Sequence, residues 1–417
     1  MRIHPRIVNI FIILTLSLVW TSALPTAAQQ KTQYSLQELV ELGLLHNPTL
    51  AASALEVTAQ EAAYEASKRL FNPELEFWFG KADSYDKLEE RNTHGISVTQ
   101  PLENPFKRSR RIQMRKFAWE EVAAQRDMRA LEVAHDIKNQ YYSLLLLQKK
   151  HELLTRIEQA IQETHRLIQK RAELGEVKEL EAIKLYVETL KARKALTELR
   201  TESGLARDNL NKLLANTLPP DFQVSGELTF QPITADEEGL LSRALAGHPL
   251  IVAQQLQLEQ SRSNISYVKW QRLPDLALKG FSDAELDGIN RGLGVSLDIP
   301  LWNFKGKELA EAENLSYKSE QEFNALRLDL AQEVRSRLRR TRLAEETLAI
   351  FSAGLMSQAE QSLNIAEISY REGEISLLEF LDSQRTYISI LRDYVDALYS
   401  WNAEKTALER AVGENIQ

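Results

Sequence analysis

The stretch "YREGEISLLEFLDSQRTY", Tyr370 to Tyr387, places a glycine inside a pattern that otherwise predicts helix. A near-copy, "AELGEVKELEAIKLYVET", runs from Ala172 to Thr189, with its glycine 198 positions earlier. Glycine readily takes the left-handed backbone conformation that ends many helices. We therefore predict that each stretch is the turn of a helical hairpin, with Gly175 and Gly373 at the two tips.

Other segments repeat in the same order. "NPTLAASALEV" begins at Asn47 and "HPLIVAQQLQL" at His248, an offset of 201, while "GISVTQPLEN" and "GVSLDIPLWN" begin 199 positions apart. Matches that keep their order and spacing over the whole chain indicate an internal duplication. We divide the chain into a first repeat, residues 29–215, a connector rich in turn residues, 216–238, and a second repeat, 239–417.

The N-terminal residues 1–28 have the three-part layout of a secretory signal peptide. Arg2 and Arg6 precede an apolar run that is too short to span a membrane, and small residues follow up to Ala28. The 417-residue chain has no cysteine and a formal charge of -8. We expect an exported protein without disulfides, and the acidic balance argues against nucleic acid as a partner.

The helical patterns are too long for an ordinary globular domain. From Phe106 to Lys170 there is no proline or glycine, and an unbroken helix of this length would extend roughly 100 Å. Apolar residues follow at steps of three and four, as in a coiled coil. We expect a returning helix after Gly175 to pair with the long helix through Ile183, Val187 and Leu190.

Each repeat also contains two segments with the alternation of a β-strand. In "LEFWF" the side chains of Leu75, Phe77 and Phe79 share one face, and "LGVSLDI" alternates in the same way. Strands alone leave two interpretations open: surface hairpins packed on the helices, or part of an outer-membrane barrel with aromatic residues at the strand ends. Four strands cannot close a barrel, so the second interpretation needs several chains. The aromatic residues in question are Phe71, Phe106, Phe281, Trp302 and Phe304.

With these motifs in place, the whole mature chain resembles the TolC family of bacterial outer membrane efflux proteins. The resemblance rests on the duplicated "HNP…FNPELEF" and "GHPL…LPDLAL" segments, on "VTQPLENPFKRSRR" and "LDIPLWNFKGK", and on the opening stretch. "FNPELEF" with "SVTQPLENPFKRSRR" is most similar to the cobalt-zinc-cadmium resistance branch. The resemblance implies a mainly α fold with a small β part. It also implies a homotrimer in which four strands per chain build a 12-stranded barrel in outer membrane lipid, above a long α-barrel in the periplasm.

The same resemblance implies a function without catalysis: an outer membrane duct that receives its cargo from a periplasmic adaptor and an inner-membrane pump of the resistance-nodulation-division type. The hairpin tips would dock the adaptor and form a closable entrance. By residue, the tips are Gly175, Glu176, Val177, Gly373, Glu374 and Ile375, and the entrance residues are Glu181, Tyr370, Glu379 and Asp382. Some family members carry an arginine at the position of Ile375 that holds the entrance shut, so the sequence leaves open how this entrance is closed.

Other classes of function find less support. The seven histidines form no metal-ligand spacing, and the sequence contains no phosphate-binding loop and no arguable catalytic set, so we expect no cofactor, no metal site and no enzyme activity. A periplasmic adaptor would normally carry one hairpin, and a structural coiled-coil protein would lack paired strands. Within the duct interpretation, heavy-metal efflux, multidrug efflux and type I protein secretion remain alternatives.

Overall fold

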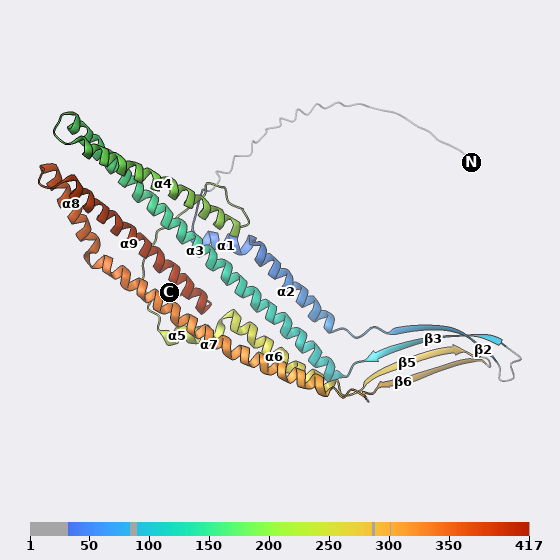
Figure 1. Cartoon of the computed structure of the whole chain (residues 1–417). Coiled ribbons are helices and arrows are strands. Elements are labelled where there is room, and N and C mark those ends of the chain that lie inside the picture. Colours follow the sequence, from blue (N-terminus) through green and yellow to red (C-terminus); the bar gives the residue numbers. More distant parts are fainter. Residues whose placement is uncertain (1–31, 84–89, 286–287, 301, 417) are drawn as a thin grey trace, which may run out of the picture.

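The computed structural model describes residues 32–83, 90–285, 288–300 and 302–416. The expected signal peptide, residues 1–28, lies outside the described residues. The chain forms an elongated body of long helices with a β-sheet at one end and two helical hairpin tips at the other (Figure 1). Among the described residues, no helix combines the length and the apolar character that crossing a membrane requires.

The elements of the two halves follow one another in the same order. The first half consists of α1 (Leu36–His46), α2 (Pro48–Ser67), β2 (Glu74–Asp83), β3 (Glu90–Leu102), α3 (Pro105–Glu173) and α4 (Glu179–Leu213). The second consists of α5 (Glu237–Gly247), α6 (Pro249–Trp270), β5 (Asp275–Ala284), β6 (Ile289–Asp298), α7 (Gly306–Ile350), the π-helical turn η1 (Phe351–Leu355), α8 (Met356–Glu372) and α9 (Leu377–Val412). Two short strands, β1 (Gln33–Tyr34) and β4 (Gln223–Val224), pair in parallel and tie the connector to the first half.

Helix α3 confirms the prediction from the proline-free run, since it continues for 69 residues, about 100 Å. Its predicted coiled-coil side is buried, including Ile137, Tyr141 and Leu144. The counterpart in the second half is not continuous, because Gly354 has φ 130° and interrupts the run between α7 and α8. A glycine can hold this angle, which most side chains resist, and the sequence pattern gave no warning of it.

One break in the helices of each half was not predicted, and one predicted packing stripe was wrong. The first helical stretch of each half is two helices, because the Asn47-Pro48 and His248-Pro249 pairs end one helix and cap the next. Proline has no N–H for the preceding turn and suits the first position of a new helix. On α4, the predicted packing stripe of Ile183, Val187 and Leu190 is exposed. The stripe that is buried instead consists of Ala182, Leu185, Thr189 and Ala192. Its two alanines allow close packing around Leu185, which is fully buried.

The four longer strands form one antiparallel sheet in the order β2-β3-β5-β6. The register aligns Leu75 with Val98, and Leu278 with Val295, on one apolar face. The opposite face is polar: Lys279 Nζ lies 3.3 Å from Glu76 Oε2, and the Trp78 indole donates to Asp283 over 3.2 Å. The alternation predicted from sequence is therefore confirmed. Exposed side chains on the apolar face include Leu75, Phe77, Phe79, Val98, Leu278, Leu293, Val295 and Leu297.

One of the expected strand-end aromatics lies elsewhere. Phe281 sits within β5 opposite Gly292 and Ser97, on the polar face of the sheet. A Cβ at residue 292 would approach the Phe281 ring within 2.6 Å, so the ring fills the space over that glycine. Phe71, Phe106, Trp302 and Phe304 are exposed beyond the strand ends.

We expect the helical body to be sensitive to cavities. Leu39 of α1 is fully buried in a cluster with Ile137 and Leu210, whereas Leu45 on the same helix is exposed. Leu39→Ala should lower the free energy of unfolding by about 2–5 kcal/mol, through lost burial and the cavity that remains. Leu45→Ala removes the same atoms and should cost less than about 0.5 kcal/mol. Denaturant unfolding of both variants tests this, and equal losses would contradict the packing described.

Candidate functional site: the paired hairpin tips

The two hairpin tips share one backbone construction. Gly175 and Gly373 have φ 78° and 79°, so both adopt the left-handed conformation that was predicted. At the first tip the Glu176 N–H donates to the carbonyl of Arg171 over 2.9 Å, and at the second the Glu374 N–H donates to the carbonyl of Ser369 over 2.8 Å. These are the hydrogen bonds of a Schellman helix end. Apart from adjoining residues of the chain, no atom of the described residues lies within 4 Å of a Cβ built at either glycine. Backbone conformation, not space, therefore requires glycine there.

An apolar cluster joins the two hairpins just behind their tips. Its buried members come from all four helices: Ile168, Ala182, Leu185, Ala366, Leu377, Phe380 and Leu381. Val177 and Ile375, the residues two positions after the tip glycines, are half-buried and pack against it. Ile375, which stands where some family members carry an arginine, therefore makes apolar contacts in this chain. The two tips consequently pack as one unit within the chain.

Tyr370 and Glu181 face each other across the two hairpins. The Tyr370 hydroxyl lies 3.3 Å from Glu181 Oε2 and donates to it, and the ring stacks on Phe380 with centroids 5.4 Å apart. Burial, followed by the negative charge and hydrogen bond of Glu181, raises the pKa of Tyr370 to about 12. The phenol therefore keeps its proton at any physiological pH and remains a donor to the carboxylate. The structure brings these two predicted entrance residues together.

Glu379 and Asp382 do not join this contact. The Glu379 carboxylate accepts the Ser376 N–H over 2.8 Å and the Ser376 hydroxyl over 3.0 Å, completing a capping box at the start of α9. The hydrogen bond from the Ser376 backbone lowers the pKa of Glu379. Asp382 is exposed one turn further along the same helix. The capping role of Glu379 was missed, although the Ser-x-x-Glu spacing is a recognised signal.

A second polar link between the hairpins was not predicted. The Arg385 guanidinium on α9 forms an ion pair with the Glu188 carboxylate on α4, and Lys191 Nζ lies 3.1 Å from the same carboxylate. Burial raises the pKa of Glu188, but the hydrogen bonds and positive charges of Lys191 and Arg385 outweigh it, so this pKa lies below its usual range. Nothing in the sequence aligns positions 188 and 385, because the two lie on different repeats and at different distances from their tip glycines.

A cleft of about 640 Å³ lies beside the first tip, between α3 and α4. His165 and Tyr186 line it, with ring centroids 5.6 Å apart, and Glu173 and Glu179 add carboxylates at its tip end. Over the part of the chain that the structure describes, no group of three or more His, Cys, Asp or Glu side chains is arranged to hold a metal ion. The cleft thus offers an apolar and acidic surface next to the tip.

Comparison with known proteins agrees with this architecture. The profile of the family described as "Outer membrane efflux protein" matches residues 39–216 and 240–414. A curated relative, the cobalt-zinc-cadmium resistance protein CzcC of Cupriavidus metallidurans, is 24% identical over 386 residues, which cover 91% of this chain and 90% of CzcC.

Solved structures show the same fold. The channel protein CusC superposes with a TM-score of 0.77 at 15% identity, over 91% of this chain and 92% of CusC. The CmeC outer membrane channel of Campylobacter jejuni superposes with a TM-score of 0.78 at 16% identity, over 92% of this chain and 86% of CmeC. The chain belongs to the outer membrane efflux protein family. It is an outer membrane efflux protein.

The Arg385–Glu188 link predicts a pH dependence at the tips. The pKa of Glu188 is lower in the folded chain than its unfolded value of about 4.3, so the link contributes above that pH and is lost on further acidification. Hydrogen exchange of residues 377–390, corrected for intrinsic rates, should quicken roughly two- to fivefold between about pH 5 and pH 2.5, as expected for an exposed pair.

Arg385→Gln should show the faster exchange already at pH 7 and lose the pH dependence. The control is Arg371→Gln, which removes an ion pair with Glu367 inside α8 alone. It should behave like the wild type. Two results would show that the ion pair does not hold the hairpins together. One is a wild-type exchange rate that does not change with pH, and the other is a control variant that exchanges as fast as Arg385→Gln.

Proposed function

We propose that three copies of this chain form one passive duct that spans the outer membrane and continues through the periplasm. The observation that carries the proposal is the separation of the molecule into an exposed apolar sheet face at one end and two paired helical tips at the other (Figure 1). The duct has no catalytic activity of its own. It conducts cargo that a pump and an adaptor deliver to the tips.

Open edges on both sides of the chain support a closed ring of copies. The sheet ends in β2 and β6, whose outer backbone groups pair with no other described strand, and lipid tolerates no open edge. Three copies joined β6 to β2 would close a 12-stranded barrel. On the helical side, exposed Val187 and Leu190 of α4 and exposed Leu328 and Leu343 of α7 provide apolar surface for the neighbouring copies.

For the cargo we propose divalent metal cations. The support is the 24% identity to CzcC over nearly the whole of both chains, since CzcC is a cobalt-zinc-cadmium resistance protein. The net charge of -8 and the exposed carboxylates at the tips fit a path for cations. The chain itself would not chelate the metal, so selection among ions belongs to an inner-membrane pump of the resistance-nodulation-division type.

We further propose that the tips dock a periplasmic adaptor and close the entrance. Gly175, Glu176 and Val177 would form one docking turn, and the equivalent turn is Gly373, Glu374 and Ile375. The Tyr370–Glu181 hydrogen bond and the Arg385–Glu188 ion pair would hold the hairpins together in the closed state. Glu379 and Asp382, repeated three times around the axis, would line the entrance with carboxylates.

Charge removal at the entrance tests this assignment. Glu379→Gln with Asp382→Asn should lower the preference of the pore for cations over anions about two- to fivefold in planar bilayers under a salt gradient. Glutamine can replace glutamate in a capping box, so α9 should keep its start. The matched control, Glu152→Gln with Glu163→Gln, removes two exposed acids of α3 further from the tip and should leave the selectivity unchanged. Wild-type selectivity in the first variant would remove those carboxylates from the entrance.

Growth of a deletion strain tests the cargo. We expect sensitivity to zinc, cobalt and cadmium salts, restored by the wild-type gene, with dyes and detergents tolerated as before. Sensitivity to dyes and detergents instead would assign the duct to multidrug efflux. Loss of secreted proteins without either sensitivity would assign it to type I secretion, and both results would overturn the metal proposal.

A further inference from the structure

The junction between the sheet and the helices carries an excess of positive charge in an otherwise acidic chain. Residues at the ends of α2 and α6 and at the starts of α3 and α7 include many cations, whereas the whole chain has a net charge of -8. The cations are Lys68, Arg69, Lys107, Arg108, Arg110, Arg111, Lys269, Arg272, Lys305 and Lys307. The junction therefore has a sign of charge opposite to that of the chain as a whole.

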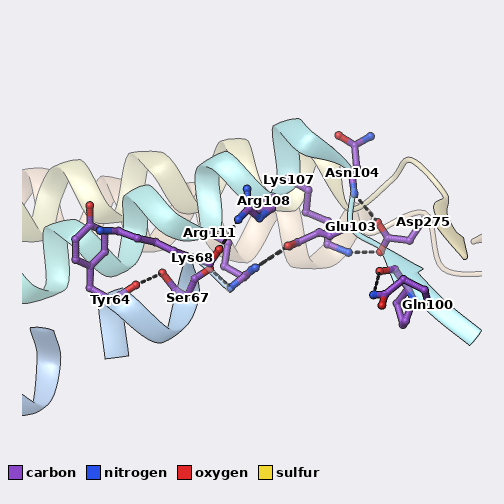
Figure 2. Close-up of polar contacts among 11 residues, drawn as sticks. Tyr64, Ser67, Lys68, Gln100, Glu103, Asn104, Lys107, Arg108, Arg111 and Asp275 are labelled. Atoms are coloured by element: carbon purple, nitrogen blue, oxygen red, sulfur yellow. Dashed lines mark hydrogen bonds and ion pairs between the residues drawn. The ribbon is translucent and has the colours of Figure 1, made fainter. Parts of the chain in front are cut away.

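Part of this charge is balanced inside the chain. Arg111 forms a bidentate contact with Glu103, with the shortest nitrogen–oxygen distance 2.6 Å, and also donates to the Ser67 carbonyl over 2.9 Å (Figure 2). Lys107 pairs with Asp275, whose carboxylate also accepts the Asn104 N–H over 3.3 Å. These contacts fasten α2, α3 and β5 to one another. They also leave the carboxylates of Glu103 and Asp275 already paired with cations.

Four of the other cations form a second, outward layer. Arg69 at the end of α2, Lys269 and Arg272 around the end of α6, and Lys307 at the start of α7 are all exposed. We call these four residues the basic belt. Among the described residues no carboxylate pairs with any of them, because Glu103, Asp275 and Glu308 are engaged elsewhere. Glu74 and Asp298 belong to the polar face of the sheet.

Exposed aromatic and apolar groups accompany the belt. Phe71 and Phe106 are 49% and 60% exposed, Phe304 is 66% exposed and Trp302 is almost entirely exposed. The two repeats place a Phe-Lys pair at equivalent points, Phe106-Lys107 and Phe304-Lys305. On the other side of these aromatics begins the apolar sheet face. Aromatic rings at the border of an apolar band, with cations just beyond it, are typical of the depth of lipid headgroups.

We propose that the basic belt binds the phosphate groups of anionic phospholipids in the periplasm-facing leaflet of the outer membrane. The inference rests on the proposed function insofar as the sheet is embedded in lipid. Charge complementarity identifies the lipid: a zwitterionic headgroup offsets its phosphate with its own ammonium, whereas an anionic headgroup leaves the phosphate charge for the protein. Arginine suits this contact because its guanidinium can donate two parallel hydrogen bonds to phosphate oxygens.

The belt would fix the depth of the duct in the membrane. Each cation near an anionic surface contributes about fivefold to binding, and three copies repeat the belt around the barrel. Together with the aromatic residues, it would hold the junction at the surface of the leaflet and leave the helices in water. Lipid recognition thereby positions the tips at a constant distance from the membrane.

The test compares lipids retained by the full-length protein in nanodiscs that contain equal amounts of phosphatidylglycerol and phosphatidylcholine. Native mass spectrometry should find the anionic lipid enriched on the wild type. The variant Arg69→Gln, Lys269→Gln, Arg272→Gln, Lys307→Gln should lose this enrichment at least fivefold. The control, Arg339→Gln with Arg340→Gln and Arg342→Gln, should retain the enrichment. It removes exposed arginines of α7 away from the sheet that pair with no carboxylate in the described part of the chain.

Several outcomes would overturn the proposal. Equal enrichment in the belt variant would show that these cations do not bind the lipid, and equal loss in the control would reduce the effect to net charge. Dissociation of the belt variant in both lipids would assign the cations to acids of a neighbouring copy. Conductance of the wild type in planar bilayers separates this test from the proposed function, because a wild type that forms no pore would refute the duct whatever lipid it retains.

Discussion

The antiparallel pairing of β3 with β5 is the contact on which the rest of the molecule depends. It joins the two halves side by side from Leu102–Leu276 to His94–Ala284, and Lys107 and Asn104 reinforce it through Asp275 (Figure 2). Because α3 leaves the sheet from β3 and α6 enters it at β5, this pairing also sets those helices against each other. It brings the two distant hairpin tips to the same end (Figure 1). It equally leaves β2 and β6 as the two open edges.

The two halves share a plan but differ mechanically. In the first half α3 runs unbroken to its tip, whereas Gly354 interrupts the equivalent run in the second half. Conversely, α9 begins with a complete capping box, whereas Lys178, the N-cap residue of α4, provides no side-chain cap. The second hairpin therefore combines a firm turn with a break further along its helix. The Tyr370–Glu181 hydrogen bond and the Arg385–Glu188 ion pair then connect the second hairpin to α4 of the first.

Positive and negative side chains gather in different regions along the long axis of the molecule. Cations collect at the junction beside the apolar sheet face, where a lipid headgroup layer supplies anions. Carboxylates collect at the tips, where Glu374, Glu379 and Asp382 are exposed in the second hairpin. The polar face of the sheet pairs its charges across strands, as Glu76 does with Lys279. The junction, the tips and the polar face of the sheet thus differ in the sign and the pairing of their charges.

Much of the fold was predictable because its signals are local. The left-handed glycines, the proline-free run of α3 and the alternation of the strands are properties of adjacent residues, and the structure confirms all three. The Asn47-Pro48 and His248-Pro249 breaks were also readable in principle, since proline and a capping residue suffice to define them. The break at Gly354 was not, because a single glycine within a long helix usually remains helical.

The sequence by itself determined the helix and strand types, the two turns and the apolar face of the sheet, because backbone preferences act over a few neighbouring residues. Only the tertiary structure decided which residues meet across the hairpins. The rotation of α4 depends on its packing along α3, and its stagger relative to α9 depends on the apolar cluster behind the tips, so a shift of one residue changes these contacts. For that reason the buried stripe of α4 is Ala182 and Leu185 instead of Ile183 and Val187, and Arg385 finds Glu188.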